Sequence, residues 1–257
     1  LQLIRNDHNN KPVIFVGAGT CGLGAGAAQT IKQAKNYLAA NSIDADVIPV
    51  GCIGLCSSEP LLDVKIPGKK RISFEKVTDD KVEALLDSVF KGEMPQQPVL
   101  GQFRDQNDQQ DWQNAPFLDE HFFLGPQQRI VLENCGIINP ESIEEYIARG
   151  GYKAYLNTLK VFSSEEICDQ IEKSGLRGRG GGGFPTGKKW KFALGTEATQ
   201  KYLICNADEG DPGAFMDRAV IEGDPHRLLE GMAIAAYGIG ASRSEEHTSE
   251  LQSPNTI

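Results

Sequence analysis

The most informative stretch of this chain is residues 175–190, which read GLRGRGGGGFPTGKKW. Its glycines have no Cβ atom, so the backbone can turn sharply and approach a flat or anionic ligand closely. The stretch also carries four cationic side chains, Arg177, Arg179, Lys188 and Lys189. Backbone N–H groups combined with cations bind phosphate, so this stretch predicts a nucleotide site. A flexible glycine hinge is the alternative; the capping box predicted before the stretch (Ser163, Glu166) and the aromatic residues in and after it argue against a hinge.

A second polar stretch, residues 205–218 (CNADEGDPGAFMDR), directly follows a strand predicted at residues 202–205. Loops at the carboxyl ends of strands are where α/β folds place ligand groups. Asn206 can both donate and accept hydrogen bonds, which suits a heterocycle edge such as the pyrimidine ring of a flavin. Three acidic side chains can accept hydrogen bonds from ribityl or ribose hydroxyls: Asp208, Glu209 and Asp211. A solvated acidic turn and a Mg²⁺ or Ca²⁺ loop are the alternatives, although EF-hand spacing is absent.

The N-terminal part of the chain, residues 12–95, is predicted to form a small α/β domain. Apolar strands are expected at residues 13–16 and 47–50, with a helix at residues 25–39 between them. Two short alternating strands, at residues 62–66 and 71–74, form a predicted hairpin, and Thr78 can cap a closing helix. The order strand–helix–strand, hairpin, helix indicates a thioredoxin-like layout.

Three of the six cysteines lie on two loops of this predicted domain: Cys21, Cys52 and Cys56. Loops that follow two parallel neighbouring strands emerge at the same edge of the sheet, so the three thiols can converge on a soft metal or an iron–sulfur cluster. Residues 17–22 also match the dinucleotide-binding pattern GxGxxG, but the second strand ends without the acidic residue that this motif requires. The remaining cysteines (Cys135, Cys168 and Cys205) are isolated, which predicts buried packing residues.

This domain resembles the thioredoxin-like [2Fe–2S] ferredoxin domains that accompany NADH-oxidising flavoproteins, whose pattern is C-x4-C followed by C-x3-C. On that resemblance the second, third and fourth cluster ligands fall on Cys21, Cys52 and Cys56. The first ligand falls on Val16, which cannot bind iron. Two alternatives stay open: a retained cluster with a substitute fourth ligand, or a decayed domain with a structural role.

Residues 128–241 closely resemble the NADH- and FMN-binding flavoprotein subunit (the F type) of respiratory complex I. The resemblance extends to the flavoprotein subunits of NAD(P)-linked, often electron-bifurcating, [FeFe]-hydrogenases. In these proteins GLRGRGGAGFPTGxKW precedes a strand ending in CNADE; Gly182 replaces the usual Ala. The implied fold is α/β: a thioredoxin-like ferredoxin-type domain, a linker, and the N-terminal part of the FMN-binding domain.

The resemblance implies roles for individual residues. FMN would be contacted by residues of both stretches: Gly178, Arg179, Gly180, Gly181, Lys189, Asn206, Asp208 and Glu209. Phe184 and Phe192 would flank the NADH adenine, with Lys189 and Asp211 near the nucleotide. Hydride passes from the nicotinamide to the flavin without a side-chain acid or base, so no catalytic residue is predicted.

The same resemblance implies partners and further cofactors. A [4Fe–4S] cluster and the second half of the flavin site are expected further toward the C-terminus, so this chain alone should bind FMN poorly. Partners would be a ferredoxin-like small subunit and an iron–sulfur or hydrogenase subunit. A non-catalytic thioredoxin-like docking subunit is the alternative function. A free dithiol oxidoreductase is excluded, because Cys52 and Cys56 are separated by three residues instead of two.

Composition and domain boundaries complete these expectations. The net charge of −9 disfavours nucleic-acid binding, and neither a membrane span nor a signal peptide is evident, which predicts a cytoplasmic protein, peripheral if attached to a membrane complex. The predicted divisions are a ferredoxin-type domain at residues 12–95, a linker at residues 96–128 and the flavin domain at residues 129–242. Residues 243–253 resemble a translated sequencing-library adapter, so residues 243–257 are expected to be a non-native tail, with the natural protein continuing past Ser242.

Overall fold

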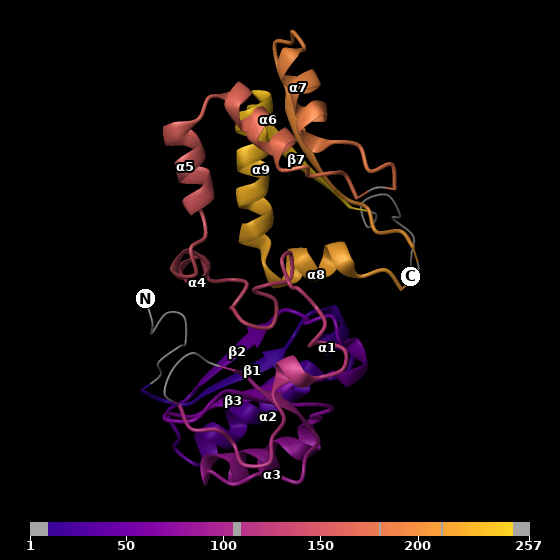
Figure 1. The fold of residues 1–257 in the computed structure, drawn as a ribbon. Helices are drawn as coiled ribbons and strands as arrows, with labels where there is room; N and C mark the ends of the chain where they lie inside the picture. The colour runs from indigo at the N-terminus through magenta and orange to yellow at the C-terminus, as the bar shows by residue number, and fades with distance from the viewer. Residues whose placement is uncertain (1–9, 105–108, 180, 212, 249–257) are drawn as a thin grey trace. The chain divides into compact units, whose positions relative to one another are not determined.

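The computed structural model describes residues 10–104, 109–179, 181–211 and 213–248 of the chain (Figure 1). The chain divides into two compact units. The first comprises Leu1–Ala148 and Ala219–Asp224, and the second comprises Arg149–Arg218 and Pro225–Ile257. No helix in the described part of the chain is long and apolar enough to cross a membrane.

A five-stranded sheet organises the first unit. Its strands are β1 (Val13–Gly17), β2 (Asp46–Val50), β3 (Leu62–Lys65), β4 (Ile72–Phe74) and β5 (Val99–Gln102), in the order β2-β1-β3-β4-β5. β1 pairs with β2 in parallel, whereas β1–β3, β3–β4 and β4–β5 are antiparallel. This mixed order confirms the thioredoxin-like layout. It also excludes the dinucleotide-binding fold, which requires a parallel sheet around its first strand.

The main hydrophobic core of the first unit lies between this sheet and two helices, α2 (Ala27–Ala40) and α3 (Asp79–Phe90). Both helices pack on the same face of the sheet (Figure 1). The fully buried side chains of that face include Ile14, Val16, Leu62 and Phe74. Burying an apolar side chain of this size contributes roughly 1.5–3 kcal/mol, so the alternation of apolar and polar residues in β3 and β4 is sufficient to fix which face of the sheet meets the helices.

The segment expected to be a linker, residues 96–128, contains structure that the sequence analysis did not predict. β5 extends the sheet, and Trp112 is buried with its indole N–H donating to the Lys70 carbonyl at 2.8 Å. The Arg104 guanidinium lies 3.8 Å from the centre of the Phe117 ring. Phe122, by contrast, is 84% exposed. The structure of this segment is determined by its pairing with distant residues. Its glutamine-rich sequence has no local periodicity from which a strand could be predicted.

Short helical segments complete the first unit: α1 (Thr20–Gly24), η1 (Cys56–Ser58), η2 (Leu118–Glu120) and α4 (Ile143–Ala148). Before α4, the Asn139 side chain accepts a hydrogen bond from the Glu141 N–H at 3.0 Å, and α4 begins four residues after Asn139. Asparagine favours such a local turn because its side chain imitates a backbone acceptor.

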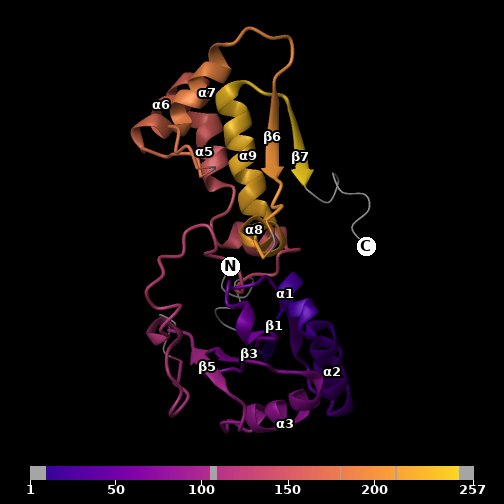
Figure 2. The ribbon, with the colours of Figure 1, turned by 90° about the vertical axis from the view of Figure 1, so that its right-hand side faces the viewer.

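The second unit is built around α9 (Pro225–Ile239), which lies against α5 (Lys153–Val161), α6 (Ser164–Lys173), α7 (Thr186–Gly195) and β6 (Tyr202–Ala207) (Figure 2). The predicted capping box is present: Ser163 accepts from the Glu166 N–H, and the Glu166 carboxylate accepts from the Ser163 N–H. α8 (Met216–Gly223) spans the division between the units. The start of the expected tail forms β7 (Arg243–Thr248), which pairs in parallel with β6.

Candidate functional site

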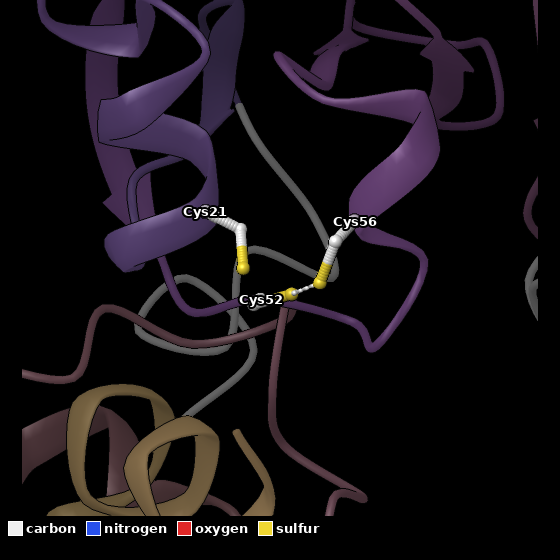
Figure 3. A group of neighbouring side chains, drawn as sticks. All are labelled: Cys21, Cys52 and Cys56. Atoms are coloured by element: carbon white, nitrogen blue, oxygen red, sulfur yellow. Dashed lines mark hydrogen bonds between the residues drawn. The ribbon is translucent and has the colours of Figure 1, made fainter. Parts of the chain in front are cut away.

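Three thiols converge at one edge of the sheet in the first unit (Figure 3). Cys21 lies in α1, just after β1, whereas Cys52 lies in the loop after β2 and Cys56 begins η1. The three sulfur atoms all lie within 4.8 Å of one another. The Cys52 and Cys56 sulfurs are 3.7 Å apart, well beyond a disulfide bond, and the Gly54 N–H donates to the Cys52 sulfur at 3.2 Å. The sequence prediction that these thiols meet is therefore supported by their geometry.

The surroundings of the three thiols favour their protonated forms when no metal is bound. The hydrogen bond with Cys56, followed by burial, raises the pKa of Cys21 to about 11. Burial raises the pKa of Cys52 and of Cys56. Because thiolates and not thiols bind metals, a metal centre here would form with release of protons.

Val16, which occupies the position of the first cysteine of the ferredoxin pattern, is buried in the hydrophobic core. Val16 is fully buried in β1, where it pairs with Pro49 and Leu62 and packs in the core that α2 and α3 cover. Its side chain has no ligand atom. The donor set of three close thiols therefore fits a [2Fe–2S] cluster at three of the four ligand positions.

A buried carboxylate near the thiols was missed by the sequence analysis. Glu59 is 7% exposed; its Oε2 accepts from the Leu61 N–H at 2.7 Å, whereas its Oε1 has no hydrogen-bond partner in the described structure. Burial raises the pKa of Glu59 to about 7. The available signal was an acidic residue three positions after the C-x3-C pattern, directly before Pro60, Leu61 and Leu62.

A second acidic residue fixes the turn that carries Cys21. The Thr20 N–H donates to the Glu222 Oε2 at 2.8 Å, and the Thr20 hydroxyl donates to the Glu222 Oε1. This carboxylate occupies the N-terminal turn of α1, where negative charge is favourable. The two residues are 202 positions apart in the chain, so no local pattern could have revealed the contact.

The glycine-rich stretch of the second unit forms an exposed hairpin-like loop before α7. The Gly178 N–H donates to the Phe184 carbonyl and the Thr186 N–H to the Leu176 carbonyl, both at 2.9 Å. A Cβ atom added at Gly181 or Gly182 would meet no atom within 4 Å. α7 begins after Pro185, and no side chain caps its N-terminus. Gly180, which the resemblance also implies as an FMN contact, lies outside the described residues.

The other cofactor-binding candidates lie on the surface of the second unit. Arg179 and Lys189 are exposed, and Phe184 and Phe192 are 50% and 68% exposed with ring centres 6.4 Å apart. At the carboxyl end of β6, the Asn206 side chain accepts from the Asp208 N–H at 3.0 Å. The Glu209 carboxylate accepts from the Asp217 and Arg218 N–H groups, at 3.0 and 3.2 Å, at the start of α8. These hydrogen bonds stay within each loop and its following helix, so a joint cradle formed by the two loops stays a prediction.

Two of the three isolated cysteines are packing residues, as expected. Cys135 and Cys168 are buried, and their thiols donate to the Ala219 and Gly238 carbonyls at 3.6 and 3.3 Å. Cys205 differs because it is only partly buried. It lies in β6, whose side chains alternate between exposed and partly buried positions up to Ala207.

Comparison with known proteins finds similarity to part of this chain. Residues 171–245 match the Nuo51 FMN-binding domain. The chain is 59% identical over 117 residues to the HndC subunit of the NADP-reducing hydrogenase of Solidesulfovibrio fructosivorans, covering 46% of this chain and 24% of that protein. It is 56% identical over 103 residues to the F subunit of NADH-quinone oxidoreductase of Aquifex aeolicus, covering 40% of this chain and 24% of that protein.

Among solved structures, the ferredoxin-like region has only a weak match. A thioredoxin-like [2Fe–2S] ferredoxin from Aquifex aeolicus matches with a TM-score of 0.31 and 15% identity, over 37% of this chain and 96% of that one. The fold assignment of the first unit therefore rests on its own strand order and on its thiol positions.

These findings define the class of the protein: an α/β chain with a thioredoxin-like ferredoxin-type region followed by part of an FMN-binding domain. The chain is a partial homologue of the flavoprotein subunits that include HndC and the F subunit of NADH-quinone oxidoreductase. It spans about a quarter of the length of these curated relatives. The resemblance predicted from the glycine-rich and CNADE stretches is confirmed.

Proposed function

We propose that the protein to which this chain contributes oxidises NADH by hydride transfer to FMN and passes the electrons singly to iron–sulfur clusters. It would act as the flavoprotein subunit of an NADH dehydrogenase or of an NAD(P)-linked hydrogenase complex. The observation that carries this proposal is the match of residues 171–245 to an FMN-binding domain, because that range contains both candidate ligand loops. The names of the two relatives as hydrogenase and oxidoreductase subunits support it.

The start of α7 is suited to hold the flavin phosphate. The Thr186 N–H already donates to the Leu176 carbonyl, but the N-terminus of α7 has no side-chain cap, and the following N–H groups and the helix dipole attract anions. The open space around Gly181 and Gly182 lets a ligand approach the backbone closely. Arg179 and Lys189 add positive charge at the surface of the same loop and helix.

The aromatic and polar residues nearby would orient the nucleotide. Phe184 and Phe192 have exposed ring faces that can stack on the adenine, with Lys189 and Asp211 near the nucleotide. Asn206 and Asp208 would bind polar edges of the flavin, and Glu209 would shape their loop because its carboxylate holds the start of α8. FMN, when bound, supplies the two-electron to one-electron conversion. The chain's residues supply position and electrostatics, so we assign no catalytic acid or base.

The thiols of the first unit would hold a [2Fe–2S] cluster through Cys21, Cys52 and Cys56. A [4Fe–4S] cluster would lie in the C-terminal part of the complete protein. The partners would be a ferredoxin-like small subunit and an iron–sulfur or hydrogenase subunit, in the cytoplasm or peripherally on a membrane complex.

Flavin content and diaphorase activity of the complete gene product test this proposal. We expect one FMN per protein and NADH-dependent reduction of ferricyanide. Lys189→Ala removes one charge-assisted contact, worth about 1.5–3 kcal/mol, and should weaken FMN binding about 10- to 100-fold. Lys153→Ala, at an exposed lysine of α5 in the same unit, is the matched control and should leave FMN binding unchanged. A complete protein that binds no FMN would favour the alternative, a non-catalytic docking subunit.

A further inference from the structure

The unpartnered carboxylate of Glu59 lies beside an incomplete set of metal ligands. Its Oε1 atom is buried and accepts no hydrogen bond in the described structure, whereas Oε2 accepts from the Leu61 N–H. Burying a charged carboxylate oxygen without a partner is costly, so an orphaned atom of this kind indicates a missing partner. A metal ion is the partner that would neutralise the carboxylate and use the free oxygen.

The carboxylate lies against the turn that carries Cys21. A Cβ atom added at Gly17 would be 2.6 Å from the Glu59 Oε2 and 2.8 Å from its Oε1. A Cβ atom added at Gly22 would be 3.2 Å from Oε2. Gly17 ends β1, directly after Val16, and Gly22 directly follows Cys21. Glu59 therefore lies beside Gly17 and Gly22, the residues that directly follow Val16 and Cys21, the two positions of the first cysteine pair in the ferredoxin pattern.

The spacing of the thiols indicates which iron lacks a ligand. Two sulfurs bound to one tetrahedral metal at about 2.3 Å lie about 3.8 Å apart. The 3.7 Å between the Cys52 and Cys56 sulfurs matches that edge. These two cysteines would share one iron, which leaves Cys21 as the remaining thiol of the cluster for the second iron. Glu59 lies on the side of Cys21, because its Oε2 is 3.2 Å from a Cβ atom placed at the adjacent Gly22.

We propose that Glu59, through its free Oε1, is the fourth ligand of a [2Fe–2S] cluster held by Cys21, Cys52 and Cys56. The carboxylate replaces the thiolate that Val16 does not supply. Assembly of the cluster displaces one proton from each thiol, and the carboxylate binds in its deprotonated form. This inference rests on the cluster part of the proposed function and is independent of the flavin.

Reconstitution of the purified chain with ferric iron and sulfide under anaerobic conditions tests the ligand. We expect the wild-type chain to retain two iron atoms and two sulfides, with two inequivalent ferric sites in its Mössbauer spectrum because one iron has an oxygen ligand. Glu59→Gln keeps the shape but removes the anionic ligand. Outer-shell changes already weaken metal sites about 10- to 100-fold, so this variant should lose iron to a competing chelator at least about ten times faster.

A matched control separates ligation from folding. Glu75→Gln changes a half-buried carboxylate of the same unit, which accepts from the Ser58 hydroxyl at 2.7 Å, and should retain iron like the wild type. The metal-free Glu59→Gln chain should melt no lower than the metal-free wild type. Equal iron retention and an unchanged Mössbauer spectrum in Glu59→Gln would overturn the inference while leaving the cluster intact. A wild-type chain that binds no iron would overturn both the inference and the cluster, and the FMN measurement would still decide the flavoprotein function.

Discussion

The two units of this chain place their candidate ligands in opposite settings. The thiols and Glu59 of the first unit are held by a packed sheet and core, and Cys52 and Glu59 are buried. The loops of the second unit present Phe184, Phe192 and the glycine stretch to the surface. A small metal centre requires side-chain atoms fixed to within tenths of an ångström, whereas a large flat cofactor requires accessible backbone and ring faces. Mutations should therefore disturb the first site through its packing and leave the open loop of the second site tolerant.

The largest expected loss of stability comes from breaking a buried ion pair in the first unit, on the face of the sheet opposite α2 and α3. The Arg71 Nη2 lies 2.6 Å from the Asp63 Oδ2 and also donates to the Gly136 carbonyl at 2.6 Å. Arg71→Met leaves the Asp63 charge buried without its partner, which costs about 3–5 kcal/mol. Urea unfolding of the chain measures this loss. Lys11→Met breaks an exposed pair with Asp44 and Asp46 and should leave the midpoint unchanged; equal losses in both variants would refute the contrast.

A smaller effect is a pH dependence of the metal-free first unit. The pKa of Glu59 is raised to about 7 by burial, so the folded chain binds this proton more tightly than the unfolded chain does. Protonation of Glu59 therefore contributes to the free energy of unfolding. This contribution is fully present below the ordinary carboxyl pKa of about 4.5 and is lost as the pH rises through about 7; its upper limit is about 3 kcal/mol. Unfolding of the metal-free wild type and of Glu59→Gln, measured from about pH 5 to pH 8, isolates this contribution. The prediction fails if the two chains show the same pH profile.

The smallest expected changes in stability come from substitutions at two glycines of the second unit. A Cβ atom added at Gly187 would lie 2.4 Å from the Glu172 backbone nitrogen, where α6 and α7 touch. Gly187→Ala should therefore destabilise the chain by about 1–3 kcal/mol through overpacking. Gly182→Ala adds a methyl group that meets no atom within 4 Å and should change stability by less than about 0.5 kcal/mol. Thermal unfolding of both variants measures the difference, and a costly Gly182→Ala would show that the loop is packed.

Local patterns in the sequence were sufficient for several elements. The alternation of residues 62–66 and 71–74 predicted β3 and β4, and the Ser163 and Glu166 capping box predicted the start of α6. The convergence of Cys21 with Cys52 and Cys56 followed from a general property of parallel strands, whose loops meet at one edge of the sheet. Each of these inferences depends on residues that lie close together in the chain or on a single strand-pairing rule.

Contacts between segments that are distant in the sequence could not be predicted and became evident only in the tertiary structure. β5 and the buried Trp112 lie in a stretch without periodicity, and they are ordered by pairing with β4 and by the Lys70 carbonyl. The anchoring of Thr20 by Glu222 joins residues 202 positions apart. The free oxygen of Glu59 became visible only when its burial and its neighbours Gly17 and Gly22 were known. The sequence determined which chemical groups are available and on which loops they lie; the folded chain decided which groups are buried together, because burial depends on packing that no local pattern encodes.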